Sequence, residues 1–194
     1  MKPRFFPMCL CLCLCLCLLG GCAGSPIDGA LQATGLRKPP PLPEAQLPPR
    51  KVALHLHAAP RLNVDARGRP LALLVRVYQL RQLDAFERLP QAAFLSPEAE
   101  RAALGADLVA VRELTLVPGQ RLDLVETMPR DAGQLGVVAL FHAPASQGWR
   151  VAFAAPDAER AGVTVGMHAC AMSVGAGAPA SGAGAKPLSL VRCQ

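Results

Sequence analysis

The cysteines near the amino terminus are the first residues of this 194-residue sequence that could support chemistry. Five of them alternate with leucine: Cys9, Cys11, Cys13, Cys15 and Cys17. Thiolates bind soft metal ions, so such a tract could hold one. The same residues also serve as small apolar side chains in a segment that enters a membrane. Lys2 and Arg4, followed by an apolar stretch over residues 5–19, favour a signal peptide, because a transmembrane helix needs roughly 20 apolar residues.

The predicted signal peptide ends in Leu19-Gly20-Gly21-Cys22, which resembles the lipobox of bacterial lipoproteins. The resemblance implies a diacylglyceryl thioether on Cys22, cleavage just before it and acylation of the new amino terminus. Three acyl chains, at about 0.8 kcal/mol per buried methylene, anchor a protein far more firmly than one. Ala23 stands where an aspartate would resemble the inner-membrane retention signal. We therefore predict a lipid anchor in the outer membrane, facing the periplasm. The alternative is an ordinary secretory signal followed by an unrelated cysteine.

Cleavage before Cys22 leaves two further cysteines, Cys170 and Cys193. Two such thiols in an oxidising compartment indicate a disulfide, which stabilises by roughly 3 kcal/mol in the chain-entropy estimate. The alternative is two unpaired buried thiols. Cleavage also lowers the net charge from +6 to +4, because Lys2 and Arg4 leave with residues 1–21. A mildly basic surface without a run of lysine or arginine argues against nucleic acid as a partner.

The histidines and carboxylates of the sequence suggest neither a catalytic site nor a cofactor site. His55 and His57 project from one face of a predicted strand, which suits two metal ligands, but the sequence shows no third. Asp65, Glu113 and Asp123 have no evident partner for acid–base work. The motifs G-x-S-x-G and H-E-x-x-H are absent from the sequence. We predict that the protein is not an enzyme and that it uses no metal or cofactor.

Composition divides the chain into three parts. Residues 1–21 form the predicted signal peptide. Residues 22–50 form a lipidated tether, because seven prolines interrupt this segment and it lacks apolar periodicity. The tether would reach about 30 Å as a flexible coil and nearer 90 Å as a polyproline helix, at about 3.1 Å per residue. Residues 51–194 form one domain, which is long enough to bury about two thirds of its unfolded surface.

Within residues 51–194, apolar side chains recur at every second position, which is the period of a β-strand. The pattern is clear in VALHLHA, residues 52–58, and in LLVRVYQL, residues 73–80. Similar runs predict about eight strands in all. Trp149 alternates with Val151 and Phe153, which places it in the core. We predict an all-β fold, an antiparallel β-sandwich with a small helical insertion over residues 84–104.

Two regions interrupt the strand pattern. Residues 84–95 and 97–104 predict short helices. Ser96 is well placed to cap the second helix, Pro97 suits its first position, and Gly105 follows its end. Residues 175–185 are rich in glycine, alanine and serine, which predicts a flexible loop between the last two strands.

Three segments resemble the TssJ family, the outer-membrane lipoproteins of the type VI secretion membrane complex. They are LNVDARGRPLALLVRVYQLRQLDAFERL, LGADLVAVRELTLVPGQ and LGVVALFHAPASQGWRVAF. They lie in the family's order between residues 52 and 156, and the lipobox agrees with them. The resemblance implies a transthyretin-like β-sandwich. It also implies a docking role, in which the lipoprotein holds the periplasmic C-terminal part of the inner-membrane protein TssM, within a complex that also contains TssL.

In the TssJ family the loop between the first two strands carries much of this contact, and here that loop is PRLNVDARGRP, residues 60–70. By position the candidate contact residues are Leu62, Asn63, Val64, Asp65, Arg67 and Arg69. The loop offers apolar side chains beside charges of both signs, and arginine is enriched at interface hot spots. The alternative is a solvated connection in which Asn63, Asp65 and Gly68 only form turns.

This chain departs from the family pattern at Val64, where relatives often have proline, and the segment from Asp157 onward does not map onto the family. Two other functions are compatible with a sandwich. A periplasmic binding module for a small ligand requires a concave apolar site. A transthyretin-like hydrolase requires histidine paired with arginine or lysine in a cleft, and the scattered histidines argue against it.

Overall fold

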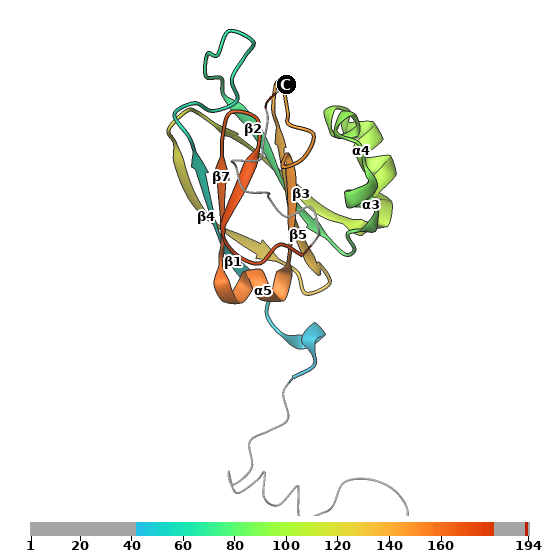
Figure 1. Cartoon of the computed structure of the whole chain (residues 1–194). Helices are drawn as coiled ribbons and strands as arrows, with labels where there is room; N and C mark the ends of the chain where they lie inside the picture. The colour runs from blue at the N-terminus through green and yellow to red at the C-terminus, as the bar shows by residue number, and fades with distance from the viewer. Residues whose placement is uncertain (1–41, 181–192, 194) are drawn as a thin grey trace, which may run out of the picture. The chain divides into compact units, whose positions relative to one another are not determined.

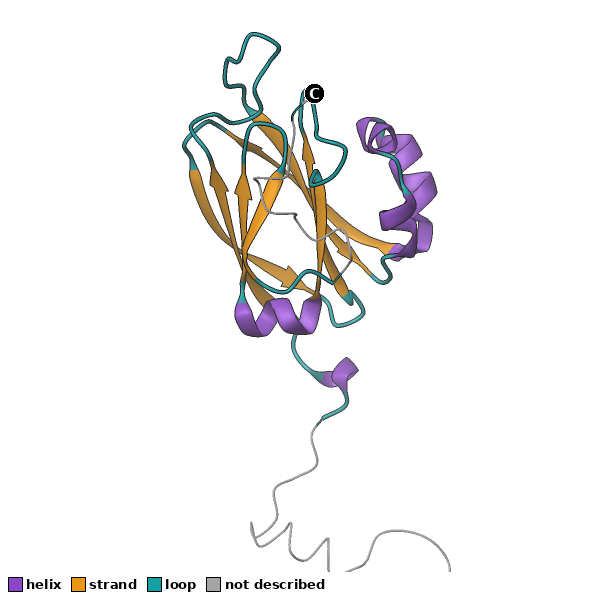
Figure 2. Ribbon diagram, viewed as in Figure 1, coloured by secondary structure: helices purple, strands orange, loops and turns teal. Residues whose placement is uncertain are grey.

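The computed structural model describes residues 42–180 and Cys193, and these residues form two four-stranded sheets packed face to face (Figure 1, Figure 2). Sheet A has the order β4-β1-β7-β8, with β1 Arg50–Ala58, β4 Arg121–Met128, β7 Val163–Met167 and β8 Met172–Ala176. Sheet B has the order β3-β2-β5-β6, with β2 Leu73–Leu80, β3 Leu108–Leu116, β5 Gln134–Leu140 and β6 Arg150–Ala154. The predicted β-sandwich with small helices is confirmed.

Alternating burial along the strands explains why this sequence forms a sandwich. In β1, the side chains of Val52, Leu54 and Leu56 are fully buried between the sheets, and the residues between them are partly exposed. In β2, Leu73 and Val75 face the same core. Burial of each such side chain contributes about 1.5–3 kcal/mol to stability. The period-two pattern therefore identified the core faces of both strands.

One strand pair departs from the predicted antiparallel arrangement. β7 runs parallel to β1, with Leu54 opposite Val163 and Leu56 opposite Val165. The chain reaches β7 from β6, in the other sheet, through helix α5, Ala155–Ala161. This helical crossover, which the sequence pattern did not predict, returns the chain to the end of sheet A where β1 begins. The other neighbouring strands in both sheets are antiparallel.

The predicted helical insertion consists of short helices. They are α3 Asp84–Arg88, η2 Gln91–Leu95, α4 Pro97–Leu104 and η3 Gly105–Asp107. Helix α4 has the ends that its sequence predicts, with proline in its first turn. The Ser96 hydroxyl accepts a hydrogen bond from Ala99 N (3.3 Å), and Gly105 follows the last helical residue.

The single helix predicted over residues 84–95 is wrong, because the chain breaks between α3 and η2. Proline lacks a backbone N–H and disfavours the helical conformation of the residue before it. Leu89, which precedes Pro90, is accordingly extended, with ψ of 128°. A 3₁₀ turn, η2, then replaces the second half of the predicted helix.

The helical insertion lies beside sheet B (Figure 1). An aromatic cluster joins the insertion to the sheet. Tyr78 of β2 contacts Phe86 and Phe94 of the insertion, with ring centroids 5.5 and 5.8 Å apart. Phe94 also contacts Trp149, which is buried as predicted. Gly136 of β5 lies so close to the Phe86 ring that a Cβ added at Gly136 would be 2.9 Å from it. Strands β2, β5 and β6 of sheet B are thus largely buried, whereas the edge strand β3 and the outward residues of β1 and β4 in sheet A are exposed or partly exposed.

The segment before β1 contacts the end of the sandwich where β1 begins. It contains the short 3₁₀ helix η1, Glu44–Gln46. The Arg130 side chain donates to Pro48 O (2.6 Å) and pairs with Glu44 (3.2 Å), and the buried Arg50 also pairs with Glu44. The last residues of the predicted tether are therefore held against the domain. Among the described residues, no helix is long and apolar enough to cross a membrane.

Candidate functional site

Four connections meet at the end of the sandwich opposite the segment before β1, at the top of Figure 1. They are the β1–β2 loop (residues 59–72), the β3–β4 turn (117–120), the β5–β6 loop (141–149) and the β7–β8 turn (168–171). We call this surface the loop end. It contains the predicted docking loop, residues 60–70.

Backbone hydrogen bonds join these connections to one another. Asn63 N donates to His168 O (3.0 Å), and Val64 N donates to Ala169 O (3.1 Å), so the β1–β2 loop rests on the β7–β8 turn. Other bonds link the β5–β6 loop to the β7–β8 turn and the β3–β4 turn to the end of β1. The loop end is therefore one connected surface and not a set of separate loops.

Two predicted contact residues, Leu62 and Asn63, are buried and hold the loop in place. Leu62 is 0% exposed and belongs to the main core. Asn63 is 5% exposed; its side-chain amide donates to Ala72 O (2.7 Å) and accepts from His142 N (2.7 Å). Its φ of 46° lies in the left-handed region, which asparagine adopts more readily than most residues. Asn63 therefore fixes the base of the β1–β2 loop to the β5–β6 loop.

Asp65 organises the tip of the loop, because its carboxylate accepts hydrogen bonds from other residues of the same loop. Asp65 accepts hydrogen bonds from Arg69 N (2.9 Å), Arg69 Nε (2.8 Å) and Arg67 N (2.8 Å). The backbone hydrogen bond from Arg69 and these further bonds lower the pKa of Asp65 below its usual value. Gly68, with φ of 73°, supplies the left-handed conformation that closes the turn. The tip thus presents Ala66, Arg67 and Arg69 to solvent.

A small cavity lies beside this tip, where the carboxyl end of the chain meets it. Its volume is about 100 Å³, and it is lined by Val64, Asp65, Ala66, His142, Ala143 and Cys193. In the structure Cys193 forms a disulfide with Cys170, which is the predicted pair. Because Cys170 lies in the β7–β8 turn, the disulfide brings Cys193 to the loop end.

His168, in the β7–β8 turn, contacts the side chain of Ser173. Its Nε2 lies 2.8 Å from the hydroxyl of Ser173. Burial lowers the pKa of His168 below its usual value, which favours the uncharged imidazole. Gly166 leaves the space for this contact, because an added Cβ would approach the Ser173 hydroxyl to 2.6 Å.

His55 and Asp123 form a pair that the linear sequence does not reveal. On the outer face of sheet A, His55 Nδ1 lies 2.6 Å from Asp123 Oδ1, and this hydrogen bond lowers the pKa of Asp123. The β1–β4 register places the two residues directly opposite each other. Only knowledge of which strands are neighbours could have identified the pair. In the part of the chain that the structure describes, no group of three or more potential ligands could hold a metal ion.

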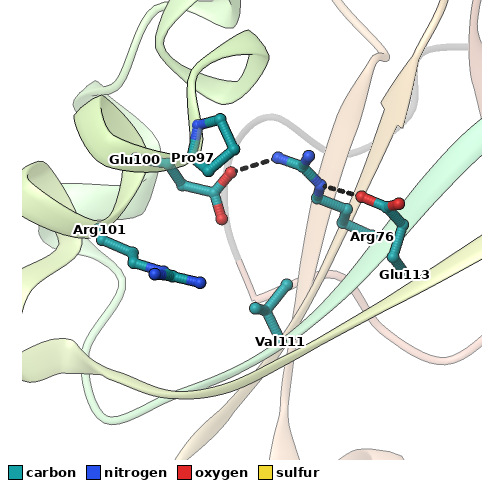
Figure 3. A pocket seen from close by; sticks show the side chains of 6 residues that line it. All are labelled: Arg76, Pro97, Glu100, Arg101, Val111 and Glu113. Atoms are coloured by element: carbon teal, nitrogen blue, oxygen red, sulfur yellow. Dashed lines mark hydrogen bonds and ion pairs between the residues drawn. The ribbon is translucent and has the colours of Figure 1, made fainter.

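A second cavity, of about 180 Å³, lies between α4 and sheet B (Figure 3). It is lined by Arg76, Pro97, Glu100, Arg101, Val111 and Glu113. Arg76 pairs with Glu100 (2.5 Å) and Glu113 (2.9 Å) and donates to Phe94 O (2.9 Å). These groups form ion pairs and hydrogen bonds with one another, and they hold the helical insertion against the sheet. Both cavities are smaller than the roughly 300–1,000 Å³ of ordinary small-molecule sites, so neither supports the ligand-binding alternative.

The other predicted features lie outside the described residues. They are the leader cysteines, Cys22, the tether before residue 42, and the loop and strand predicted after residue 180 except Cys193. Gly175 and Ala176, which begin the predicted loop, belong to β8.

Comparison with known proteins identifies the family. The family profile described as type VI secretion lipoprotein, VasD, EvfM, TssJ matches residues 50–170. No curated protein matches the chain. Among solved structures, the type VI secretion lipoprotein TssJ1 from Pseudomonas aeruginosa is 32% identical, and the match covers 69% of this chain and 100% of that chain with a TM-score of 0.61.

Two structures of lower identity share the fold. Lip from Serratia marcescens, a membrane-bound component of the type VI secretion system, is 21% identical, covers 66% of this chain and 96% of that chain, and has a TM-score of 0.57. A chain in the structure described as the TssM C-terminal domain from EAEC is 22% identical, with 64% and 97% covered and a TM-score of 0.54. The profile match and the identity to TssJ1 are the stronger findings, and the profile match includes the predicted docking loop, residues 60–70. This chain belongs to the TssJ family of structural, non-enzymatic lipoproteins of type VI secretion.

Proposed function

We propose that this chain is an outer-membrane lipoprotein that docks the periplasmic C-terminal part of TssM in a type VI secretion membrane complex that also contains TssL. Family membership supports this role, as does the shared fold of a chain in the structure described as the TssM C-terminal domain. The observation that carries the proposal is the position of the β1–β2 loop. Its exposed tip, residues 65–69, projects at the end of the sandwich opposite the segment that leads toward the lipid anchor (Figure 1).

The anchor in this proposal is Cys22, lipidated after removal of residues 1–21. Pro48 and Glu44 contact the domain, so the tether of this proposal that precedes these contacts is residues 22–42. This segment would reach about 65 Å as a polyproline helix and roughly 25 Å as a flexible coil. The domain would face the periplasm, at a distance from the outer membrane that the tether sets.

The predicted contact residues divide into two groups in this proposal. Arg67 and Arg69, at the exposed tip, contact the partner, and the half-buried Val64 and Asp65 border that contact. Leu62 and Asn63 act indirectly, because they hold the loop in its conformation. The role requires no bond chemistry.

Photo-crosslinking in intact cells tests the docking surface. With p-benzoylphenylalanine at position 66, irradiation is expected to give an adduct with TssM, because Ala66 is an exposed residue at the loop tip. Immunoblotting and mass spectrometry would identify the adduct. The matched control is the same residue at position 102, since Ala102 is an exposed alanine on α4. Equal adducts from both positions, or an adduct from position 102 alone, would contradict the assignment.

Substitution of the lipobox cysteine tests the anchor. Cys22→Ser is expected to abolish incorporation of labelled palmitate and to release the protein from the membrane fraction, because serine cannot form the thioether. Cys17→Ser, which changes another leader cysteine, should keep both the label and the membrane association. Sucrose-gradient fractionation should place the wild type with outer-membrane markers. Label on the Cys22→Ser protein would reject the lipobox.

A further inference from the structure

We infer that the partner surface that docks on the loop end is acidic, and that four arginines at this end bind it. This inference rests on the proposed function and adds the chemistry of the partner. The loop-end arginines are Arg61, Arg67, Arg69 and Arg121.

The four connections of the loop end, together with Arg121 at the start of β4, carry four arginines and one carboxylate, that of Asp65. All four arginines are exposed. Arg67 and Arg69 lie at the loop tip, and the guanidinium of Arg61 approaches the same tip, since a Cβ at Gly68 would be 3.9 Å from its Nη2. Among the residues that the structure describes, the loop end therefore carries an excess of three positive charges on one connected surface.

Asp65 offers little opposing charge to a partner. Its side chain is 12% exposed, and its oxygens already accept hydrogen bonds from Arg67 and Arg69. Burial lowers the pKa of the half-buried His168 in the β7–β8 turn, and the exposed His142 of the β5–β6 loop adds no negative charge. The exposed charge of the loop end is accordingly almost all positive.

Arginines at the opposite end of the sandwich are neutralised by carboxylates. Arg130 pairs with Glu159 (3.2 Å) and with Glu44 (3.2 Å), and Arg81 pairs with Asp131 (2.7 Å). The excess of positive charge is thus a property of the loop end and not a consequence of the net charge of +6 alone.

An acidic protein surface is the partner that fits this charge. Arginine binds carboxylates through two parallel hydrogen bonds and is frequent at interface hot spots. A cluster of like charges attracts an opposite surface over about 10 Å at moderate salt and raises the association rate. The loop end lies opposite the segment that leads to the anchor, which favours a protein that approaches from the periplasm over the lipid headgroups of the outer membrane.

The test measures binding of the purified full-length lipoprotein, in detergent, to the periplasmic domain of TssM by surface plasmon resonance. Wild-type affinity is expected to fall about tenfold or more between 50 and 300 mM NaCl, mostly through the association rate. The triple variant Arg61→Glu/Arg67→Glu/Arg121→Glu is expected to bind at least about tenfold more weakly than wild type at 50 mM NaCl. Arg69 is left unchanged because it holds the Asp65 turn. The matched control is Arg101→Glu, an exposed arginine on α4, which should bind as wild type.

The possible outcomes distinguish failure of the acidic-partner inference from failure of the proposed docking function. If wild type captures TssM but neither salt nor the triple variant changes the affinity, the acidic-partner inference is overturned and the docking function stands. If wild type fails to capture TssM at any salt, both are overturned. If the variant loses binding to phosphatidylglycerol vesicles and keeps its affinity for TssM, the arginines bind lipid and the inference is overturned. The salt dependence of wild type decides the question even if the triple variant does not fold.

Discussion

Glu100→Ala is expected to lower the free energy of unfolding by about 3 kcal/mol, because it leaves the charge of Arg76 without its buried partner. The side chains of Glu100 and Arg76 are 4% and 12% exposed, and they meet at 2.5 Å between α4 and β2 (Figure 3). Without the Glu100 carboxylate, the guanidinium of Arg76 is a buried charge that has lost its buried partner. It lies beside the aromatic cluster that holds the helical insertion. Urea unfolding, followed by circular dichroism, would measure the change.

The second partner of Arg76 provides the matched control. Glu113 lies 2.9 Å from Arg76, but its side chain is 53% exposed, so Glu113→Ala should cost less than about 1 kcal/mol. The double variant Arg76→Leu/Glu100→Leu should recover part of the stability, because it removes both buried charges together. Equal losses from Glu100→Ala and Glu113→Ala would show that burial does not decide the strength of this network.

Asn63→Ala is expected to cost about 3 kcal/mol of stability and to weaken capture of TssM at least tenfold. The substitution leaves two part-buried backbone groups unpaired, the carbonyl of Ala72 and the amide of His142, at about 1–3 kcal/mol each. It also places alanine at φ of 46°, a conformation that costs it about 1 kcal/mol. Thermal unfolding would report the first effect, and surface plasmon resonance well below the unfolding temperature would report the second.

Two further substitutions at the same position separate these causes. Asn63→Gly loses both hydrogen bonds but tolerates the left-handed conformation, so it should be less destabilising than Asn63→Ala. Asn63→Asp keeps the acceptor for His142 N, but it puts a carboxylate oxygen beside Ala72 O at a buried position, so it should be more destabilising than Asn63→Gly. If all three variants unfold and bind as wild type does, Asn63 does not fix the loop.

Local patterns in the sequence predicted the local parts of the fold. Period-two alternation identified the strands, and Ser96, Pro97 and Gly105 identified the ends of α4, because each signal depends on residues within a few positions. The break at Pro90 follows from an equally local rule that the apolar pattern of residues 84–95 obscured. The parallel pairing of β1 with β7 was not predictable in this way, since it depends on a crossover between sheets.

The candidate site also combines features that the sequence predicted with features that only the fold reveals. Resemblance to the TssJ family predicted the docking loop, but position alone did not distinguish its buried residues from its exposed ones. Leu62 and Asn63 are buried because the loop rests on the β5–β6 loop, 79 residues away at His142, and on the β7–β8 turn, 105 residues away at His168. Asp65 is occupied by its own neighbours in the turn. Three of the four loop-end arginines are already visible in the sequence of the β1–β2 loop, and only Arg121 is added by the fold, which places the start of β4 at the same end.

The course of β1 has a mechanical consequence in the proposed function. β1 runs without interruption from the segment before it to the base of the predicted docking loop, and it is paired with β4 on one side and β7 on the other. A pull between the proposed anchor and the proposed partner would therefore act on the two ends of a single strand that is already extended. The covalent backbone of β1 would carry the load, and the hydrogen-bond ladders to β4 and β7 would not have to break.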